Sequence, residues 1–380
     1  MNNFTFQNPT KLLFGKGMID KLPEQLSKDK RIMITFGGGS VKKNGVYDQV
    51  INALNGYDFI EFWGIEPNPT IETLRKAIIL GKEKKVNFLL AVGGGSVIDG
   101  TKLIAAGLLY EGDAWDIVKK GHEKNTIPLG TVLTLPATGS EMNAGAVISC
   151  LATNEKFAFG SNNPVFSVLD PETTFTLPDY QIACGVADTF VHTMEQYMTT
   201  AGQSRLMDRW AEGILSTLIE IAPGVKSNKK NYAQMADFML SATMALNGFI
   251  SMGVTEDWVT HMIGHELTAL HGITHGETLA IVLPGTLRVL KEQKKEKLIQ
   301  YVERIWGITE GDDNERVDRA IEKTEDFFRS IGLVTRLSEK NIGEETIMEV
   351  QRRFNERKVA FGENGNVTGD VAAQILRATL

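Results

Sequence analysis

The sequence predicts two domains of different class, an α/β domain over residues 1–177 and an all-helical domain over residues 178–380. Three observations support this division. At 380 residues the chain is long for a single hydrophobic core. Short apolar runs alternate with helical patterns in the first half. After Asp170 and Pro171, long helical patterns follow one another with almost no strand candidate between them.

Four apolar runs in the first half are predicted strands, at residues 31–36, 59–63, 87–92 and 131–135. Between them lie segments such as residues 71–85, whose apolar residues recur at helical spacing with charged residues on the opposite face. Alternation of strand and helix produces a mostly parallel sheet covered by helices. The first domain is therefore expected to have a Rossmann-like architecture.

Five segments of the second half have helical periodicity, namely residues 187–198, 209–221, 236–250, 297–308 and 316–332. Pro178, in LPDYQ, marks the expected start of this helical domain. No internal repeat of solenoid period is visible.

The composition is that of an ordinary globular protein with a slight acidic balance. A net charge of −7 argues against a broad nucleic-acid-binding face. No apolar run is long enough to cross a bilayer, and the N-terminus lacks the features of a signal peptide, so a cytoplasmic location is expected. Cys150 and Cys184 form no CxxC motif and are expected to pack as small apolar side chains.

Two glycine turns each follow a predicted strand and precede a helical pattern, FGGGSVKKNG from Phe36 and VGGGSVIDGTK from Val92. Glycines let backbone amides approach a phosphate closely, and the helix N-terminus adds positive potential. Neither turn completes G-x-G-x-x-G, and neither is a Walker A loop. One such turn alone is more simply a flexible turn, but two of them in this context favour nucleotide binding.

The first turn favours NADP over NAD. An NAD site commonly places an acidic side chain after the strand to hold the adenosine 2′-hydroxyl. Lys42 and Lys43 follow the turn, and the turn itself offers free amides and a hydroxyl from Gly37, Gly38, Gly39 and Ser40. These groups suit a 2′-phosphate. The alternative is that both lysines belong to a solvated helix face.

A third loop, LPATGSEMN, follows the predicted strand at residues 131–135. Its Thr138, Ser140 and Asn143 could line a cofactor groove at the carboxyl ends of the strands. Alternatively, they could cap the next helix.

Five of the six histidines fall in the second half, in an arrangement typical of a metal site. Asp188 and His192 in DTFVH are four residues apart, so one helix face can present both. His261 and His265 in HMIGH form a second such pair, and His271 and His275 follow. One carboxylate and several imidazoles from separate helices suit a divalent transition metal with a position left open for substrate.

Spacing alone leaves open which two of the four downstream histidines bind the ion. HMIGH is not HExxH, so a zinc-protease motif is absent. His122, in the charged segment KKGHEKN, fits an ordinary surface residue. The metal site and the two glycine turns together indicate a metal-dependent dehydrogenase, whose ion acts as a Lewis acid on an alcohol or carbonyl oxygen.

The chain resembles the iron-containing alcohol dehydrogenase family, and within it the NADPH-dependent butanol dehydrogenase and aldehyde reductase branch. The resemblance runs nearly end to end, through NNFTFQNPTKLLFGKG, GIEPNP, AVGGGSVIDGTK, LPATGSE, the histidine segment ALNGFISMGVTEDWVTHMIGHELTALHGITHGETLAIVLP, and FGENGNVTGD. It implies a dehydroquinate synthase-like fold, with a Rossmann-like nucleotide domain and a helical metal domain. It also implies a homodimer that forms through an N-terminal strand within residues 4–14.

The resemblance implies that the metal, Fe2+ or Zn2+, is held by Asp188, His192, His261 and His275. His265 matches a non-ligand histidine that orders the nicotinamide ring or relays a proton. Two departures from the family pattern stand in this segment. Thr274 precedes His275 where relatives often have proline, and His271 is an additional histidine that could compete for the metal or contact substrate.

The resemblance also implies cofactor contacts. It places the pyrophosphate at Gly93, Gly94, Gly95 and Ser96, and the 2′-phosphate at Gly37 to Ser40. Asp99 would lie near the nicotinamide-side ribose or carboxamide and take part in catalysis. Thr138 and Ser140 would line the cofactor, with Lys156 as a further candidate near it.

The expected activity is reversible hydride transfer between NADPH and small aldehydes or primary alcohols. Tyr180 and Trp258 are candidates for the walls of the substrate pocket. One alternative is a dehydroquinate synthase-like lyase that recycles bound NAD, but the first glycine turn and the few basic residues in the histidine segment disfavour it. Another is a non-catalytic protein that binds metal or nucleotide without turnover.

Overall fold

The computed structural model describes residues 1–380, which divide into two compact units. The α/β unit contains residues 7–178 and 228–247, and the helical unit contains residues 1–6, 179–227 and 248–380. The expected combination of an α/β part and an all-helical part is confirmed. A single break between residues 177 and 178 does not describe these units. Residues 1–6 belong to the helical unit, and residues 228–247 belong to the α/β unit. None of the helices combines the length and the apolar character that a membrane span requires.

The α/β unit is built on a six-stranded parallel sheet with the strand order β1-β8-β5-β4-β2-β3. The four predicted strands are confirmed as β2 (Arg31–Phe36), β3 (Asp58–Phe62), β4 (Phe88–Gly94) and β5 (Leu129–Leu135). Of the two shortest strands, β1 (Lys11–Phe14) lies in the range 4–14 where the family resemblance implied a strand, whereas β8 (Phe166–Leu169) was not predicted. A strand of four residues is too short to show a periodic pattern of its own.

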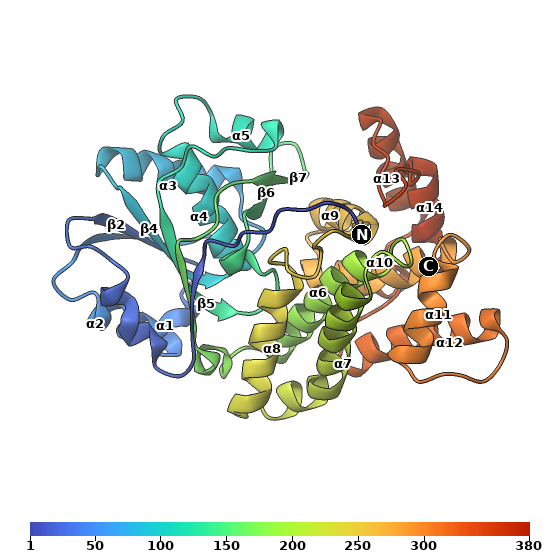
Figure 1. The fold of residues 1–380 in the computed structure, drawn as a ribbon. Helices are drawn as coiled ribbons and strands as arrows, with labels where there is room; N and C mark the ends of the chain where they lie inside the picture. Colours follow the sequence, from blue (N-terminus) through green and yellow to red (C-terminus); the bar gives the residue numbers. More distant parts are fainter. The chain divides into compact units, whose positions relative to one another are not determined.

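Both faces of the sheet are covered, because successive side chains of a strand point to opposite faces. In β2, Ile32, Ile34 and Phe36 join the core under η1 (Met18–Glu24), α1 (Ser40–Lys43) and α2 (Val46–Ala53), whereas Met33 joins the other core. That second core lies under α3 (Ile71–Glu83), α4 (Gly95–Gly107) and α5 (Ala114–Lys120). Figure 1 shows α3 and α4 on one side of β2 and β4, and α1 and α2 on the other.

A small antiparallel hairpin, β6 (Gly145–Cys150) and β7 (Glu155–Gly160), packs beside α4. Two short helical turns, η2 (Ser140–Met142) and η3 (Pro171–Thr174), complete this part of the chain. Helix α8 (Tyr232–Ala245) also belongs to the α/β unit, where the Thr243 hydroxyl donates to the Glu141 carboxylate at 2.5 Å.

The predicted helix at residues 236–250 begins and ends later than α8 (Tyr232–Ala245). Helix α8 ends at Ala245, since Leu246 leaves the helical conformation and Gly248 has a φ of +83°. Glycine adopts this left-handed conformation at little cost, and it is a common signal for the end of a helix.

The helical unit is formed by nine elements: α6 (Asp179–Tyr197), α7 (Arg205–Ser227), α9 (Val259–His271), α10 (His275–Val289), α11 (Lys295–Arg304), α12 (Asp313–Ser330), η4 (Ser338–Lys340), α13 (Glu344–Arg357) and α14 (Gly369–Arg377). The predicted helix at residues 209–221 lies in α7, and those at 187–198, 316–332 and 297–308 overlap α6, α12 and α11, each of which ends earlier. Helix α6 is buried from Ile182 to Tyr197 and packs against α7, α9 and α10. A helix buried on all sides is a rigid support for functional side chains.

Candidate active site

Helix α6 presents two polar side chains at one point inside the helical unit. Asp188 and His192 are one turn apart, and Nδ1 of His192 lies 3.6 Å from Oδ1 of Asp188. Both residues are buried, with relative exposures of 3% and 4%. Two titratable side chains at such depth in an apolar helix require a partner of opposite charge or a set of hydrogen bonds.

Helices α9 and α10 bring two further imidazoles to the same point. Nε2 of His261 and Nε2 of His275 each lie 3.7 Å from Oδ1 of Asp188. One ligand atom from each of these three residues falls within 4.8 Å of the other two. The His192 ring stacks on the His261 ring with 4.5 Å between centroids. The four side chains therefore converge around one carboxylate oxygen.

This set of donors fits a divalent transition metal. A carboxylate oxygen and imidazole nitrogens are the ligands that Fe2+ and Zn2+ accept. Nε2 of His261 is buried and has no hydrogen-bond partner in the structure, as expected of an atom that a metal ion would engage. The side chain of His275 is 20% exposed, against 6% for His261, so the cluster is open on the His275 side. An open side provides the coordination position that substrate needs.

Glu195 lies on the same face of α6, one helical turn after His192, and it contacts His261. Its Oε2 is hydrogen-bonded to Nδ1 of His261, and its Oε1 accepts from the backbone N–H of Thr260 at 2.5 Å. Burial lowers the pKa of His261, but the adjacent Glu195 and Asp188 carboxylates raise it to about 9. Sequence analysis did not single out Glu195. The signal was the spacing of seven residues in DTFVHTME, which returns to the face of Asp188 after two turns.

His265 and His271 have different surroundings. The His265 ring lies beside the cluster, with its centroid 5.0 Å from that of His275 and 6.3 Å from that of His261. His271 ends α9 as an exposed residue, and its Nε2 is hydrogen-bonded to Oγ1 of Thr346 at 2.9 Å. His271 therefore does not join the converging histidines.

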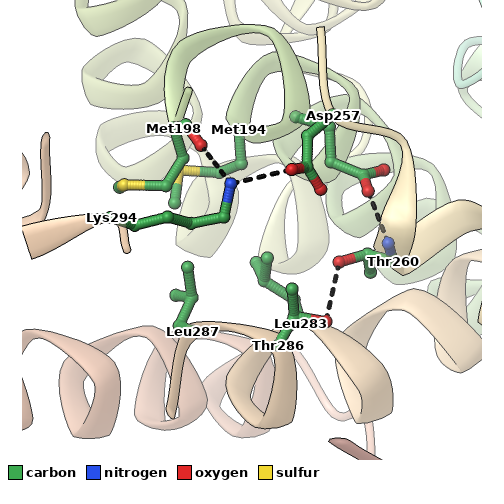
Figure 2. Close-up of a pocket in the computed structure, with 9 residues that line it drawn as sticks. Met194, Met198, Asp257, Thr260, Leu283, Thr286, Leu287 and Lys294 are labelled. Carbon is green, nitrogen blue, oxygen red and sulfur yellow. Dashed lines mark hydrogen bonds and ion pairs between the residues drawn. The ribbon is translucent and has the colours of Figure 1, made fainter. Parts of the chain in front are cut away.

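Trp258 covers the cluster on another side. Its ring centroid lies 5.2 Å from that of His261 and 6.1 Å from that of His192. A cavity of ≈10 Å³ lies behind the cluster, lined by residues that include Met194, Leu283 and Leu287. Figure 2 shows its lining. This space holds one water at most, so it is not a substrate pocket.

The first glycine turn, in the α/β unit, joins β2 to α1. Gly39 has a φ of +96°, and nothing lies within 4 Å of the position of a Cβ at Gly38 or Gly39. Ser40 is exposed at the start of α1. The turn itself contains no acidic side chain, as the sequence indicated.

Lys42 and Lys43 are both exposed, and Nζ of Lys42 lies 4.1 Å from the ring centroid of Trp63 and 5.0 Å from that of Tyr47. The Trp63 ring also stacks on the Phe36 ring, with 4.1 Å between their centroids. The nearby carboxylate of Glu61 accepts from the Tyr47 hydroxyl at 2.8 Å and from Nε1 of Trp63 at 2.7 Å. The aromatic side chains thus hold both a cation and an anion at this end of the sheet.

The second glycine turn runs from the end of β4 into α4. No side chain caps the first turn of α4, so its N–H groups are available to an anion. A Cβ on Gly95 would lie 2.4 Å from Oγ1 of Thr138, which shows why this position is glycine. Asn68 connects the turn to the hairpin, since its N–H donates to Oγ of Ser96 at 3.4 Å and its Oδ1 accepts from Nζ of Lys156 at 3.0 Å. Sequence analysis did not single out Asn68.

Asp99 lies in a buried network that the sequence did not reveal. Its carboxylate accepts from Oγ of Ser140 at 2.5 Å and from the N–H of Val147 at 2.9 Å. Lys102, fully buried, donates to Oγ of Ser140 at 2.7 Å and to Oδ1 of Asn143 at 3.2 Å. Burial raises the pKa of Asp99, opposed by Lys102, and lowers the pKa of Lys102 to about 8. The polar atoms of Asp99, Ser140 and Asn143 are therefore engaged within the protein, where they fasten the loop after β5 to α4.

The chain belongs to the iron-containing alcohol dehydrogenase family. Residues 9–171 match the model of the iron-containing alcohol dehydrogenase domain, and residues 182–380 match the C-terminal model of the same family. The expected family is thereby confirmed, and with it the class of enzyme, an oxidoreductase.

Individual relatives cover the whole chain. The NADPH-dependent aldehyde reductase YqhD of Escherichia coli is 53% identical over 100% of both chains. A probable NADH-dependent butanol dehydrogenase of Bacillus subtilis is 42% identical over the same share. The crystal structure of E. coli YqhD matches with a TM-score of 0.97 and covers 100% of this chain and 99% of its own. The NADH-dependent butanol dehydrogenase A of Thermotoga maritima, 34% identical, matches with a TM-score of 0.95 over 100% and 99%.

Proposed function

We propose that this protein is a metal-dependent, NADP(H)-dependent reductase of small aldehydes that also runs in reverse as an alcohol dehydrogenase. The observation that carries the proposal is the convergence of Asp188, His192, His261 and His275 on one buried point of the helical unit. The similarity to an aldehyde reductase and to butanol dehydrogenases supports the substrate class.

Those four side chains are the proposed ligands of one divalent ion, Fe2+ or Zn2+. When bound, the ion supplies a Lewis acid for the carbonyl oxygen of the aldehyde. The burial of Asp188 keeps its charge unscreened, and the partial exposure of His275 leaves the open side for substrate. Trp258 is proposed to bound the substrate space on the side of His192 and His261, because its ring lies against these two histidines.

NADPH is the proposed hydride donor. The α4 amides and the glycines Gly93 to Gly95 suit the pyrophosphate, and Gly37 to Ser40 suit the 2′-phosphate. Lys42 supports this choice, because the rings of Trp63 and Tyr47 hold its charge beside the turn. Lys156, joined to Ser96 through Asn68, is proposed to add positive charge near the cofactor.

Two side chains have proposed roles in the chemical step or its support. Reduction of an aldehyde consumes one hydride and one proton, so the product oxygen must acquire a proton. An imidazole nitrogen of His265 is the proposed source, since its ring lies beside the cluster without being one of the four converging side chains. Asp99 is proposed to act on the cofactor through Ser140 and the loop that it supports.

The proposal is tested by steady-state oxidation of NADPH and of NADH with butanal as substrate, with chelator-treated protein as the control. We expect turnover that prefers NADPH and is lost on treatment with the chelator. A clear preference for NADH would refute the role of Gly37 to Ser40 and leave the dehydrogenase activity standing. Absence of turnover with both coenzymes in metal-loaded protein would refute the proposed reaction.

A homodimer is the proposed assembly. β1 is an edge strand of the sheet, so the side of its backbone that faces away from β8 is available to a second copy. Sedimentation equilibrium of the full chain distinguishes this proposal from a monomer.

A further inference from the structure

The contact between Glu195 and His261 bears on which nitrogen of that histidine faces Asp188 and the other two histidines. Oε2 of Glu195 is hydrogen-bonded to Nδ1 of His261, and Nε2 of the same ring points toward Asp188. A carboxylate accepts hydrogen bonds and donates none, so Nδ1 must carry the proton in this pair. In the neutral ring, the form that binds a metal ion, Nε2 is then left with its lone pair directed toward Asp188.

The second oxygen of Glu195 is also in use. Oε1 accepts from the backbone N–H of Thr260 at 2.5 Å, and the backbone carbonyl of Glu195 accepts from the N–H of Asp257 at 2.9 Å. Glu195 therefore binds three groups at the start of α9, which belong to Asp257, Thr260 and His261. Both carboxylate oxygens are needed, because Thr260 and His261 each present an N–H.

Asp257 and Lys294 add further hydrogen bonds to the segment that leads into α9. Figure 2 shows Nζ of Lys294 donating to Asp257 and to the backbone carbonyl of Met198, both at 2.8 Å. The other oxygen of Asp257 accepts from the N–H of Val259 at 3.2 Å. Two buried carboxylates thus bind the first N–H groups of α9, where negative charge is favourable.

Trp258 lies between these two anchors in an uncommon conformation, with a φ of +67°. A bulky side chain rarely adopts the left-handed region, and it persists there only where the surroundings fix the backbone. Its neighbours supply that constraint through Asp257 and Thr260. The start of α9, and with it the direction of His261, is therefore fixed by hydrogen bonds and not by helix propensity alone.

From this geometry we infer that Glu195 is a positioning residue for the metal site. It fixes the tautomer of His261, with the proton on Nδ1, and it fixes the orientation that presents Nε2 to the ion. A carboxylate behind a metal-binding histidine raises the basicity of the ligand and removes its rotational freedom. The inference rests on the proposed metal site and adds a residue to it.

Glu195→Gln tests the inference with little change in shape. Glutamine offers one acceptor oxygen where the N–H groups of Thr260 and His261 require two, and its amide N–H₂ must face one of them. If it faces His261, Nδ1 becomes the acceptor and the proton moves to Nε2, the wrong nitrogen for a ligand. We therefore expect metal affinity to fall, by about 10–100-fold.

The measurement is the dissociation constant for Zn2+, obtained by competition with a chromogenic chelator on protein freed of metal. Cobalt(II) absorption and the thermal midpoint of the metal-free protein are recorded for the same samples. Glu212→Gln is the matched control, because Glu212 is also a buried carboxylate of the helical unit, 6% exposed, and binds Tyr197 and Arg304 and no histidine. A merely structural role would lower the midpoint of both variants and leave the Co2+ spectrum unchanged.

Weaker Zn2+ binding and an altered Co2+ spectrum in Glu195→Gln alone support the inference. Affinity within about threefold of the unaltered protein would overturn it, because a lost positioning contact costs at least tenfold. If the unaltered protein itself binds no ion, the proposed metal site fails and not the positioning role alone. Should Glu195→Gln fail to fold, Glu195→Asp carries the test, since it keeps both acceptors and moves them one methylene away from the ring.

Discussion

In the proposed function, coenzyme choice depends on a few side chains beside the first glycine turn. Ser40 is exposed at the start of α1, and the turn before it has open space around Gly38 and Gly39. The only acidic group that β2 and β3 bring close, Glu61, is occupied by Tyr47 and Trp63. The turn contains no acidic side chain that would repel a phosphate, and the cation of Lys42 is held against the Trp63 ring.

Ser40→Asp is predicted to reverse this arrangement. A carboxylate at the first residue of α1 would repel the 2′-phosphate of NADPH and accept the 2′-hydroxyl of NADH. Solvent screens a like-charge contact at this exposed position to about 1.4 kcal/mol, so kcat/KM for NADPH should fall by about 10-fold. Steady-state kinetics with each coenzyme check this, and kcat/KM for NADH serves as the internal control. An equal loss with both coenzymes would contradict the assignment of the turn to the 2′-phosphate.

At the scale of single residues, the sequence revealed the histidines but not their supports. Asp188 and His192 share a helix face by local spacing, which the sequence displays. Lys102 contacts Ser140, which is 38 residues away in the sequence. Asn68 contacts Lys156, which is 88 residues away. No local pattern encodes such a pairing, so it becomes visible only once the chain is folded.

At the scale of secondary-structure elements, the start of α9 depends on a buried ion pair. Nζ of Lys294, 2% exposed as a side chain, contacts both Asp257 and Glu363. Because Asp257 in turn caps α9, the pair connects the beginning of α9 to the beginning of α11.

Lys294→Met is predicted to lower the free energy of unfolding by about 3–5 kcal/mol, since it leaves two carboxylates buried without their cation. Chemical denaturation followed by circular dichroism measures the change. Lys295→Met is the control, as its side chain makes no ion pair with these carboxylates. Equal effects of the two substitutions would show that the ion pair does not hold α9 in place.

The approach of α4 to the loop after β5 leaves no room for a side chain at Gly95. Gly95→Ala is predicted to lower stability by about 1–3 kcal/mol, the usual cost of overpacking, because its Cβ would overlap Thr138. The same change should weaken NADPH binding, measured by the quenching of intrinsic fluorescence. Gly213→Ala, in the exposed interior of α7 with open space around it, should instead stabilise the protein by about 0.5–1 kcal/mol. Similar losses in both variants would contradict the packing argument.

The elements that the sequence predicted correctly are those with a strong pattern of their own. β2, β4 and β5 are buried apolar runs, and α6, α7 and α12 are long periodic helices. The hairpin β6–β7 was not predicted, because its half-buried strands depend on α4 for their packing. The end of α8 was misplaced because the helical pattern continues past Ala245 although the backbone does not.

At the scale of the whole molecule, family and fold class are shared with relatives that differ in coenzyme. The E. coli relative is named for NADPH and the B. subtilis relative for NADH, at 53% and 42% identity over complete chains. The alternation of strands and helices suffices to predict such a fold. Coenzyme and substrate depend on a small number of side chains, and these must be tested one by one.

The central claim is that one divalent ion held by Asp188 and the three histidines is required for aldehyde reduction. It is tested most directly by titrating metal-free protein with Fe2+ or Zn2+ while NADPH oxidation by butanal and bound metal are both measured. Asp188→Asn is compared with His122→Ala, which removes an exposed histidine of the α/β unit. We predict activity that rises with bound metal and saturates at one ion per chain, and that is lost in Asp188→Asn alone. Full turnover without metal, or an unchanged titration of Asp188→Asn, would contradict the account.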